Sequence, residues 1–470
     1  MATEGELRAA RAVAAVVSAR GAGWAATAVE RPPMADHAET AGWDQTLVID
    51  GWRNSRGASN LAFNEQVKHL QRCGRQIAHF AFGQSPFPIP ELAVAALRQH
   101  AGEHAYLPVA GLPELRRAIC DFHLRHDHIQ LDADYMLVGP GSKELLYLTM
   151  SVFNGDLILV APAWTTYEPQ SRLAGKVATV IQTGSETHFK VTSDHLETLF
   201  KSRRMLPHRM MVLTNPGNPT GLQYTEQELR DLSETCRRHR VIVLSDEIYA
   251  RLTFDSTHVS MAKVYPEGTI LTSGFSKWLS AGGWRMGYAH YPAALAPLLS
   301  AVRSAASNTY SCAPAPQQRA LAAALQPKHA HQLDTYIGTC CRLLRAVGDY
   351  CARQLHAVGV KGYPSQGAFY FMPDFEVCRG ALAARGITTG DQMVGAILQE
   401  ADVALMASSC FLMSETDLST RFCFVCLDGA AALAALDAGE SLDDAFVERH
   451  CAQLVAGVRR LCAWVLANSA

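Results

Sequence analysis

The feature that most constrains the fold is the alternation of short apolar segments with longer helical stretches between about residues 84 and 320. This alternation is typical of a mostly parallel β-sheet that carries helices on both faces. Each apolar segment ends in a small or polar residue, as a buried strand does where it leaves the sheet. The predicted strands are residues 135–138, 157–160, 178–181, 210–213, 241–244 and 269–272.

The rest of the chain predicts further parts around this sheet. Residues 1–45 are rich in Ala and Arg and contain little strand-forming sequence, so we expect an N-terminal extension that is disordered. Residues 46–90 are predicted to form an N-terminal arm and part of a small domain, and 91–330 the large domain. Residues 331–470 are predicted to form the rest of a smaller α+β domain. The fold class is therefore α/β, with two domains of unequal size.

Composition excludes several classes of protein. The 470 residues contain 42 Lys+Arg and 44 Asp+Glu, a net charge of -2, and this balance argues against a nucleic-acid partner. The apolar runs are shorter than the roughly 18 to 20 residues that cross a bilayer, so no membrane association is expected.

Cysteine usage and the N-terminal sequence bear on the compartment. The 13 Cys are scattered and odd in number, which indicates free thiols and a cytoplasmic protein. Import into an organelle through the N-terminal extension stays open, because that segment is rich in Arg. It also contains Glu4, Glu6 and Glu30, which transit peptides usually lack.

Two groups of residues resemble metal-binding sequences, but neither predicts a metal site. Cys423 and Cys426 have the spacing of half a zinc or redox motif, yet they lie in an apolar run, and residues three apart in a strand face opposite sides. His123, His126 and His128 have no second group of ligands at a matching spacing. We therefore expect these histidines at a solvated helix end.

Chemically useful side chains follow several of the predicted strands, where parallel sheets bind their ligands. Asn218 lies in an Asn-Pro-Gly-Asn-Pro-Thr-Gly loop whose Pro and Gly residues fix the backbone. Asp246 ends a strand, where a half-buried carboxylate needs a cation or a proton donor, and Tyr249 is three residues away. Lys277 lies in a Gly-rich segment and can form a Schiff base with an aldehyde, while Arg285 offers a planar fork for a phosphate.

The order of these segments strongly resembles that of the class I/II aminotransferases, the aspartate aminotransferase-like branch of fold type I pyridoxal-phosphate enzymes. The similarity covers nearly the whole chain after about residue 45 and implies the large PLP-binding domain and smaller domain of that fold. The segments that carry it are 215–221 (NPGNPTG), 245–249 (SDEIY), 276–277 (SK) and 283–288 (GWRMGY), with support from 82–84, 106–111 and 420–424.

This resemblance implies a role for each matching residue toward the cofactor pyridoxal 5'-phosphate. Lys277 is implied to bind the cofactor covalently and, once freed, to move the substrate's α-proton. Asp246 is implied to pair with the protonated pyridine nitrogen. Asn218 and Tyr249 are implied to donate hydrogen bonds to the phenolic oxygen, and Trp164 to stack on the ring.

The phosphate and the substrate are implied to bind at further matching positions. The phosphate would lie on the backbone amides of Gly141, Ser142 and Lys143, where a Gly-rich turn opens a helix, and against the side chain of Arg285. Tyr106 would reach the phosphate from the neighbouring subunit of a homodimer with a shared active site. The substrate-binding residues implied by the family are Gly83, Asn218 and Arg421, of which Arg421 would bind the α-carboxylate.

One position departs from the family pattern. Many relatives have Ser or Thr three residues before the lysine as a phosphate ligand, whereas this chain has Gly274. Ser273 or Ser276 is a candidate for that contact, or the contact is absent.

The function that the resemblance implies is an amino-acid aminotransferase, which transfers an amino group from an L-amino acid to a 2-oxo acid by a ping-pong mechanism. The same residues also serve a pyridoxal-phosphate lyase or cyclase, such as a C–S lyase or a cyclopropane-forming enzyme, because only the fate of the α-carbanion differs. A non-catalytic sensor with this fold is the third alternative. No arginine for a second carboxylate is evident, so the sequence leans away from aspartate as the preferred donor.

Overall fold

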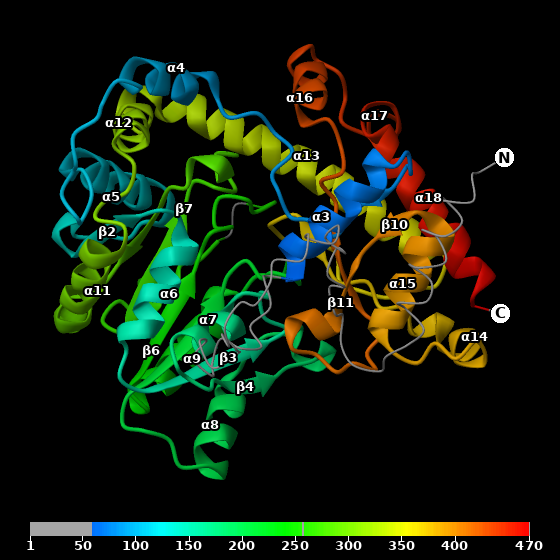
Figure 1. Ribbon diagram of the computed structural model, residues 1–470, viewed down its shortest axis with the longest axis horizontal. Helices are drawn as coiled ribbons and strands as arrows, with labels where there is room; N and C mark the ends of the chain where they lie inside the picture. Colours follow the sequence, from blue (N-terminus) through cyan, green and yellow to red (C-terminus); the bar gives the residue numbers. More distant parts are fainter. Residues whose placement is uncertain (1–58, 256–257, 470) are drawn as a thin grey trace, which may run out of the picture.

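The structure is a computed structural model that describes residues 59–255 and 258–469. Its centre is a seven-stranded sheet of order β2-β8-β7-β6-β5-β3-β4 (Figure 1). The strands β3 to β7 run parallel to one another, whereas β8 is antiparallel to both β2 and β7. Their bounds are β2 Met136–Gly139, β3 Asp156–Ala161, β4 Thr179–Gln182, β5 Arg209–Thr214, β6 Val241–Asp246, β7 Thr269–Gly274 and β8 Gly287–His290.

The predicted α/β fold with a mostly parallel sheet is confirmed. All six predicted strands are present, each within two residues of its expected bounds. The strand β8 was not predicted, because its four residues Gly-Tyr-Ala-His follow a Gly-rich segment and contain no apolar run.

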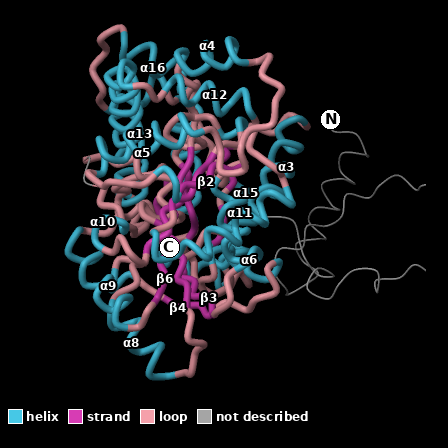
Figure 2. Tube along the Cα trace, turned by 90° about the vertical axis from the view of Figure 1, so that its left-hand side faces the viewer, coloured by secondary structure: helices cyan, strands magenta, loops and turns pink. Residues whose placement is uncertain are grey.

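Helices cover both faces of this sheet, as the edge-on view in Figure 2 shows. Alternate residues of β3 point to opposite faces: Leu157 and Leu159 pack with α6 and α11, whereas Ile158 packs with α8, α9 and α10. The bounds are α6 Ser142–Val152, α7 Tyr167–Leu173, α8 Ser193–Ser202, α9 Glu226–Arg238, α10 Met261–Val264 and α11 Ala296–Thr309. Three further helices, α4 Glu91–His100, α5 Pro113–Asp127 and α12 Ala315–Ala324, pack together beside the β2 edge.

The smaller part of the fold combines the first described residues with the C-terminal third of the chain (Figure 1). Strand β1 (Ala78–His79) pairs with β10 (Val403–Ala404), and β11 (Met406–Ala407), β12 (Thr420–Cys423) and β9 (Tyr370–Phe371) form an antiparallel sheet. The helices of this part are α3 Ser59–Arg72, α13 Ala330–Ala357, α14 Arg379–Ala384, α15 Gly390–Ala401, α16 Gly429–Asp437, α17 Asp444–His450 and α18 Ala452–Ala467. The extension predicted for residues 1–45 lies outside the described residues.

None of the helices in the described ranges is long and apolar enough to cross a membrane. The thirteen cysteines are unpaired, and seven of them are buried.

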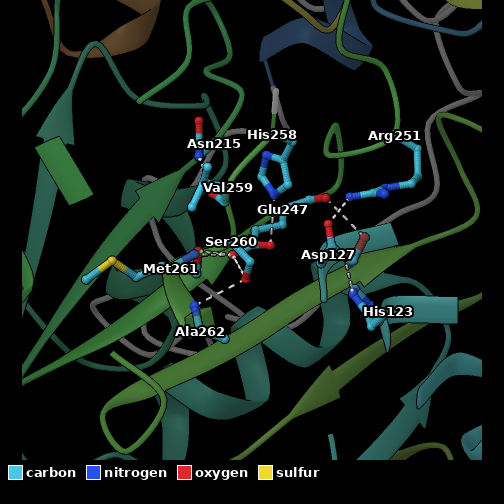
Figure 3. A network of polar contacts seen from close by, with 12 residues as sticks. His123, Asp127, Asn215, Glu247, Arg251, His258, Val259, Ser260, Met261 and Ala262 are labelled. Carbon is cyan, nitrogen blue, oxygen red and sulfur yellow. Dashed lines mark hydrogen bonds and ion pairs between the residues drawn. The ribbon is translucent and has the colours of Figure 1, made fainter. Parts of the chain in front are cut away.

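Figure 3 shows a network of charged and polar groups that includes Glu247, the residue directly after β6. The expectation of a solvated helix end is wrong for His123, because that side chain is only 2% exposed. Its ring bonds the Asp127 carboxylate at 2.7 Å and the Tyr288 hydroxyl at 2.9 Å. Asp127 also forms an ion pair with Arg251. This network was not predicted, because Tyr288 and Arg251 are 165 and 124 residues away from their partners His123 and Asp127.

Glu247, the residue after the last residue of β6, forms the centre of a second part of this network (Figure 3). Its carboxylate accepts hydrogen bonds from the Ser245 and Ser260 hydroxyls at 2.8 and 2.9 Å and from the Met261 amide at 3.1 Å. The His258 ring lies 3.2 Å from its other oxygen. Glu247 therefore ties the segment that leads into α10 to the end of β6.

We expect Asp127→Asn to lower the melting temperature by about 5 °C or more, because it leaves Arg251 without its buried counter-ion. Burial by itself raises the pKa of Asp127, but the His123 hydrogen bond and the Arg251 charge outweigh it and lower that pKa. The stabilisation is therefore complete above about pH 4, where an unfolded aspartate ionises, and is lost as the pH falls below it.

Thermal unfolding of both proteins across pH 3 to 7 tests this expectation. The gap between them should be widest at neutral pH and narrow below about pH 4. Asp134→Asn is the matched control, since the Asp134 side chain is 90% exposed and should tolerate the change at every pH. An Asp127→Asn protein as stable as the control would contradict the role of the network.

Candidate active site

Lys277 lies just beyond β7, in the loop that leads to β8, and its amine is surrounded by site residues. The amine donates a hydrogen bond to the Gly83 carbonyl at 2.7 Å and lies 5.5 Å from the Tyr249 ring and 5.4 Å from the Phe369 ring. Desolvation, together with the positive charge of Arg421, lowers the pKa of Lys277 to about 8. A substantial fraction of this amine is therefore neutral and nucleophilic near physiological pH.

Asp246, the last residue of β6, is a buried carboxylate that is 3% exposed. Burial raises its pKa to about 6, although the Tyr167 hydroxyl at 2.7 Å and the Ile248 amide at 3.3 Å partly offset that effect. Within residues 59–255 and 258–469, no Lys or Arg lies within ion-pair distance of it. The carboxylate can therefore accept a strong interaction from a cationic ligand.

Arg421 on β12 is a buried cation, with 1% of its surface exposed. Its guanidinium donates to the Ala81 carbonyl at 2.5 Å and to the Asn218 side-chain oxygen at 3.1 Å, and its Nε has no partner. In the described part of the chain, no carboxylate forms an ion pair with it. A planar cation of this kind is suited to bind a carboxylate ligand by two parallel hydrogen bonds.

The start of α6 forms a cradle of backbone amides. Gly141 precedes the helix with a φ of 93°, and a Cβ there would come within 2.3 Å of the Arg285 guanidinium. Gly287 of β8 supports this cradle, because its Cβ would lie 2.3 Å from the Ser142 nitrogen. Arg285 itself donates to the carbonyls of Gly282 and Pro140 at 2.9 and 3.1 Å. The helix end and the exposed guanidinium together suit an anion.

Lys143 and Trp164 lie beside each other near this cradle. The Lys143 amine is 5.0 Å from the Trp164 ring, and burial and the Arg285 charge lower its pKa. Trp164 also contacts the Tyr167 ring edge-on, with the ring centres 5.4 Å apart. The Tyr167 hydroxyl in turn donates to Asp246, so Tyr167 connects Trp164 to the buried carboxylate.

Ser273 and Ser276 differ in whether their hydroxyls can take the place of the phosphate ligand that is missing at Gly274. The Ser273 hydroxyl is buried and donates to the Glu247 carbonyl at 3.1 Å, so it is already used. A side chain at position 274 would lie within 2.9 Å of the Met286 carbonyl. Ser276 is partly exposed, and its hydroxyl makes no such bond to a backbone carbonyl in the described part of the chain. Of the two candidate serines, Ser276 is therefore the one whose hydroxyl can bind a ligand.

Two contacts within the site were not predicted from the sequence. The Tyr167 hydroxyl bonds Asp246, and the Tyr370 hydroxyl bonds the Tyr249 hydroxyl at 2.7 Å. Tyr167 lies only three residues after Trp164, but nothing in that spacing indicates a bond to a residue 79 positions away. Tyr370 lies in an alternating apolar segment that predicts a core strand. Among the described residues, no group of three or more His, Cys, Asp or Glu is placed to hold a metal ion.

Comparison with known proteins defines the family. The model for aminotransferase class I and II matches residues 76–438. The chain is 32% identical to an aspartate aminotransferase from Geobacillus stearothermophilus, over 75% of this chain and 89% of that one. It is 31% identical to an aspartate/prephenate aminotransferase from Cereibacter sphaeroides, over 78% and 92% of the two chains.

The fold agrees with the sequence comparison. An aspartate aminotransferase from Thermus thermophilus, solved with maleate, matches at a TM-score of 0.75 and 24% identity, covering 90% of this chain and 99% of that one. The chain belongs to the class I and II aminotransferase family and is a transaminase. The expected enzyme class is therefore confirmed, and the comparisons do not favour the lyase, cyclase or sensor alternatives.

Proposed function

We propose that the chain uses pyridoxal 5'-phosphate to transfer the amino group of an L-amino acid to a 2-oxo acid. The observation that carries this proposal is a cluster of three charged groups that form no ion pair within residues 59–255 and 258–469: the Lys277 amine, the Asp246 carboxylate and the Arg421 guanidinium. A cofactor with an aldehyde would supply a partner for Lys277, and its protonated ring nitrogen a partner for Asp246. A substrate with a carboxylate would supply the partner for Arg421. The residues present therefore fit the cofactor that the family implies.

When bound, the cofactor supplies an electron sink for the α-carbon of the substrate. Lys277 is proposed to hold it covalently, because with a pKa lowered to about 8 its amine is neutral far more often than that of an ordinary lysine, and to move the α-proton when released. Asp246 is proposed to keep the ring nitrogen protonated. Asn218 and Tyr249 are proposed to donate to the phenolic oxygen, and Trp164 to cover the ring.

The phosphate is proposed to lie in the cradle at the start of α6. Gly141, Ser142 and Lys143 would supply backbone amides, and Arg285 a positive charge. The shift in the pKa of Lys143 supports this placement, because one of its causes is the nearby charge of Arg285. Two converging cations suit a dianionic group. Ser276 is the proposed hydroxyl ligand.

The substrate is proposed to bind through its α-carboxylate to Arg421, which Asn218 orients at 3.1 Å. Gly83 leaves room for it, and its carbonyl accepts from the Lys277 amine. The same residues receive the amino acid in the first half of the cycle and the oxo acid in the second. Because both substrates use one site, the first product must leave before the second substrate binds, which is the order of a ping-pong mechanism.

Relatives named aspartate aminotransferases make L-aspartate the donor that we propose. The sequence-based lean away from aspartate depended only on finding no arginine for a second carboxylate. We also propose a homodimer, because Tyr106 is 87% exposed and is the residue implied to reach the neighbouring site. Light scattering should give twice the mass of one chain.

The pH dependence of cofactor capture tests the role of Lys277. Only the neutral amine attacks an aldehyde, so we expect the rate at which cofactor-free protein binds pyridoxal phosphate to rise up to about pH 8 and then level off. A lysine with an ordinary pKa near 10.4 would show a rate that keeps rising tenfold per pH unit. Stopped-flow absorbance of the yellow product measures this rate.

Borohydride reduction of the captured cofactor locates the amine. Peptide mass analysis should find the reduced cofactor on Lys277. A label spread over surface lysines, or a rate that climbs steadily to pH 10, would contradict the proposal.

A further inference from the structure

Tyr370 contacts residues from both halves of the proposed site. It lies on β9 and is 1% exposed. Its hydroxyl is 2.7 Å from the Tyr249 hydroxyl, and its ring centre is 4.9 Å from the central guanidinium carbon of Arg421. The hydroxyl also occupies the space beside Gly83, where a Cβ would lie only 1.9 Å from it. Among the described residues, only Tyr370 both bonds the Tyr249 hydroxyl and packs its ring against the Arg421 guanidinium.

The direction of the hydrogen bond between the Tyr249 and Tyr370 hydroxyls decides which of them can donate a proton to a ligand. Burial raises the pKa of both Tyr249 and Tyr370, so both are protonated at neutral pH. One proton lies within the hydrogen bond between them, and the acceptor of that bond keeps its own proton for another partner. In the described part of the chain, neither hydroxyl has another acceptor, so either one can be the donor until a ligand takes the second proton. With Tyr370 as the donor, the Tyr249 proton is free for a ligand.

The ring of Tyr370 acts on the second group, the Arg421 guanidinium. The rings of Tyr370 and Phe411 lie 4.9 and 5.0 Å from it. Aromatic faces stabilise a desolvated cation without neutralising it, whereas a carboxylate would occupy its donors. Arg421 is therefore kept in place with its Nε still available.

We propose that Tyr370 is a positioning residue for both the cofactor and the substrate. Its hydroxyl donates to Tyr249 and so directs the Tyr249 proton to the phenolic oxygen of the cofactor, and its ring holds Arg421 for the α-carboxylate. This inference rests on the function proposed above. It adds a residue that connects the two binding sites.

Tyr370→Phe removes the hydroxyl and keeps the ring. A weaker Tyr249 donor stabilises the phenolate less, so the pKa at which the yellow band of the bound cofactor titrates should rise by about half a unit. The kcat should fall severalfold, whereas the KM for L-aspartate should stay within about twofold. Spectrophotometric titration of the cofactor-loaded protein measures the pKa without any turnover.

Tyr370→Leu removes the ring as well. The pKa of the band should rise as in Tyr370→Phe, and the KM for L-aspartate should also rise by about fivefold or more, because the cation–π contact is lost. Tyr363→Phe is the matched control, since the Tyr363 hydroxyl is exposed and bonds only the Ser185 carbonyl at 3.1 Å. It should change neither quantity.

The inference is overturned if Tyr370→Phe leaves the pKa of the band unchanged while Tyr249→Phe raises it. It is also overturned if both Tyr370 variants change only the melting temperature. Should Tyr370→Leu fail to fold, Tyr370→Phe decides the outcome alone. A wild-type protein that forms no yellow band with pyridoxal phosphate would instead refute the proposed function, so the two failures are distinguishable.

Discussion

Lys277→Ala is expected to abolish transamination, with a loss of at least about 10³-fold in kcat, because general acid–base catalysis alone contributes about 10² to 10⁴ and the covalent attachment is lost as well. No other lysine amine is placed like this one, 2.7 Å from the Gly83 carbonyl and between the Tyr249 and Phe369 rings, in the described part of the chain. The yellow band should be absent after dialysis, since the cofactor can then be held only by non-covalent contacts.

Lys263→Ala is the matched control for this variant. The Lys263 amine forms a surface ion pair at 3.0 Å with Glu226, which is not a residue assigned to the site, and such pairs contribute little. Steady-state assays and absorbance spectra of both variants give the comparison. A Lys277→Ala protein that keeps turnover near the wild-type rate would refute the whole site assignment.

Asp246→Asn is expected to lower kcat by about 10² to 10³-fold while the protein stays folded. Asparagine has the same shape but no charge, and loss of one partner from a buried charge pair costs about 2 to 5 kcal/mol. The effect should fall mainly on kcat, because the interaction of Asp246 with the protonated ring nitrogen stabilises the transition state more than the bound substrate. The Tyr167 hydroxyl can still bond the asparagine oxygen, which helps to keep the side chain in place.

Measurement of kcat and KM, together with a melting curve, separates these effects. Asp231→Asn serves as the control, because Asp231 is exposed on α9 and its carboxylate accepts a hydrogen bond from Gln227, four residues earlier on the same helix. If Asp246→Asn melts within a few degrees of the wild type and retains kcat within about threefold, the assignment of Asp246 is wrong.

Much of the large sheet could be predicted from the sequence, because its strands are buried on both faces and therefore appear as continuous apolar runs. The segments 157–160 and 241–244 show this plainly, and the structure places both within longer strands. Asp246 and Lys277 were found for the same reason, since both follow such runs. The strand β8 has no apolar run, and only its pairing with β2 and β7 reveals it.

The contacts that orient the site could not be predicted. Tyr167 and Asp246 are 79 residues apart, and Tyr249 and Tyr370 are 121 residues apart. No local pattern indicates which side chains meet across such distances. The burial of His123 was mispredicted for the same reason, because its partner Tyr288 comes from β8, which was itself not predicted.

The most direct test of the central claim, amino transfer through a bound cofactor, is an absorbance spectrum of the cofactor-loaded protein during addition of single amino acids without any oxo acid. We expect L-aspartate to convert the yellow band to the pyridoxamine form, and a 2-oxo acid added afterwards to restore it. A band that no amino acid bleaches, or one that recovers by itself while ammonia, a thiol or a cyclic product accumulates, would contradict the proposed function.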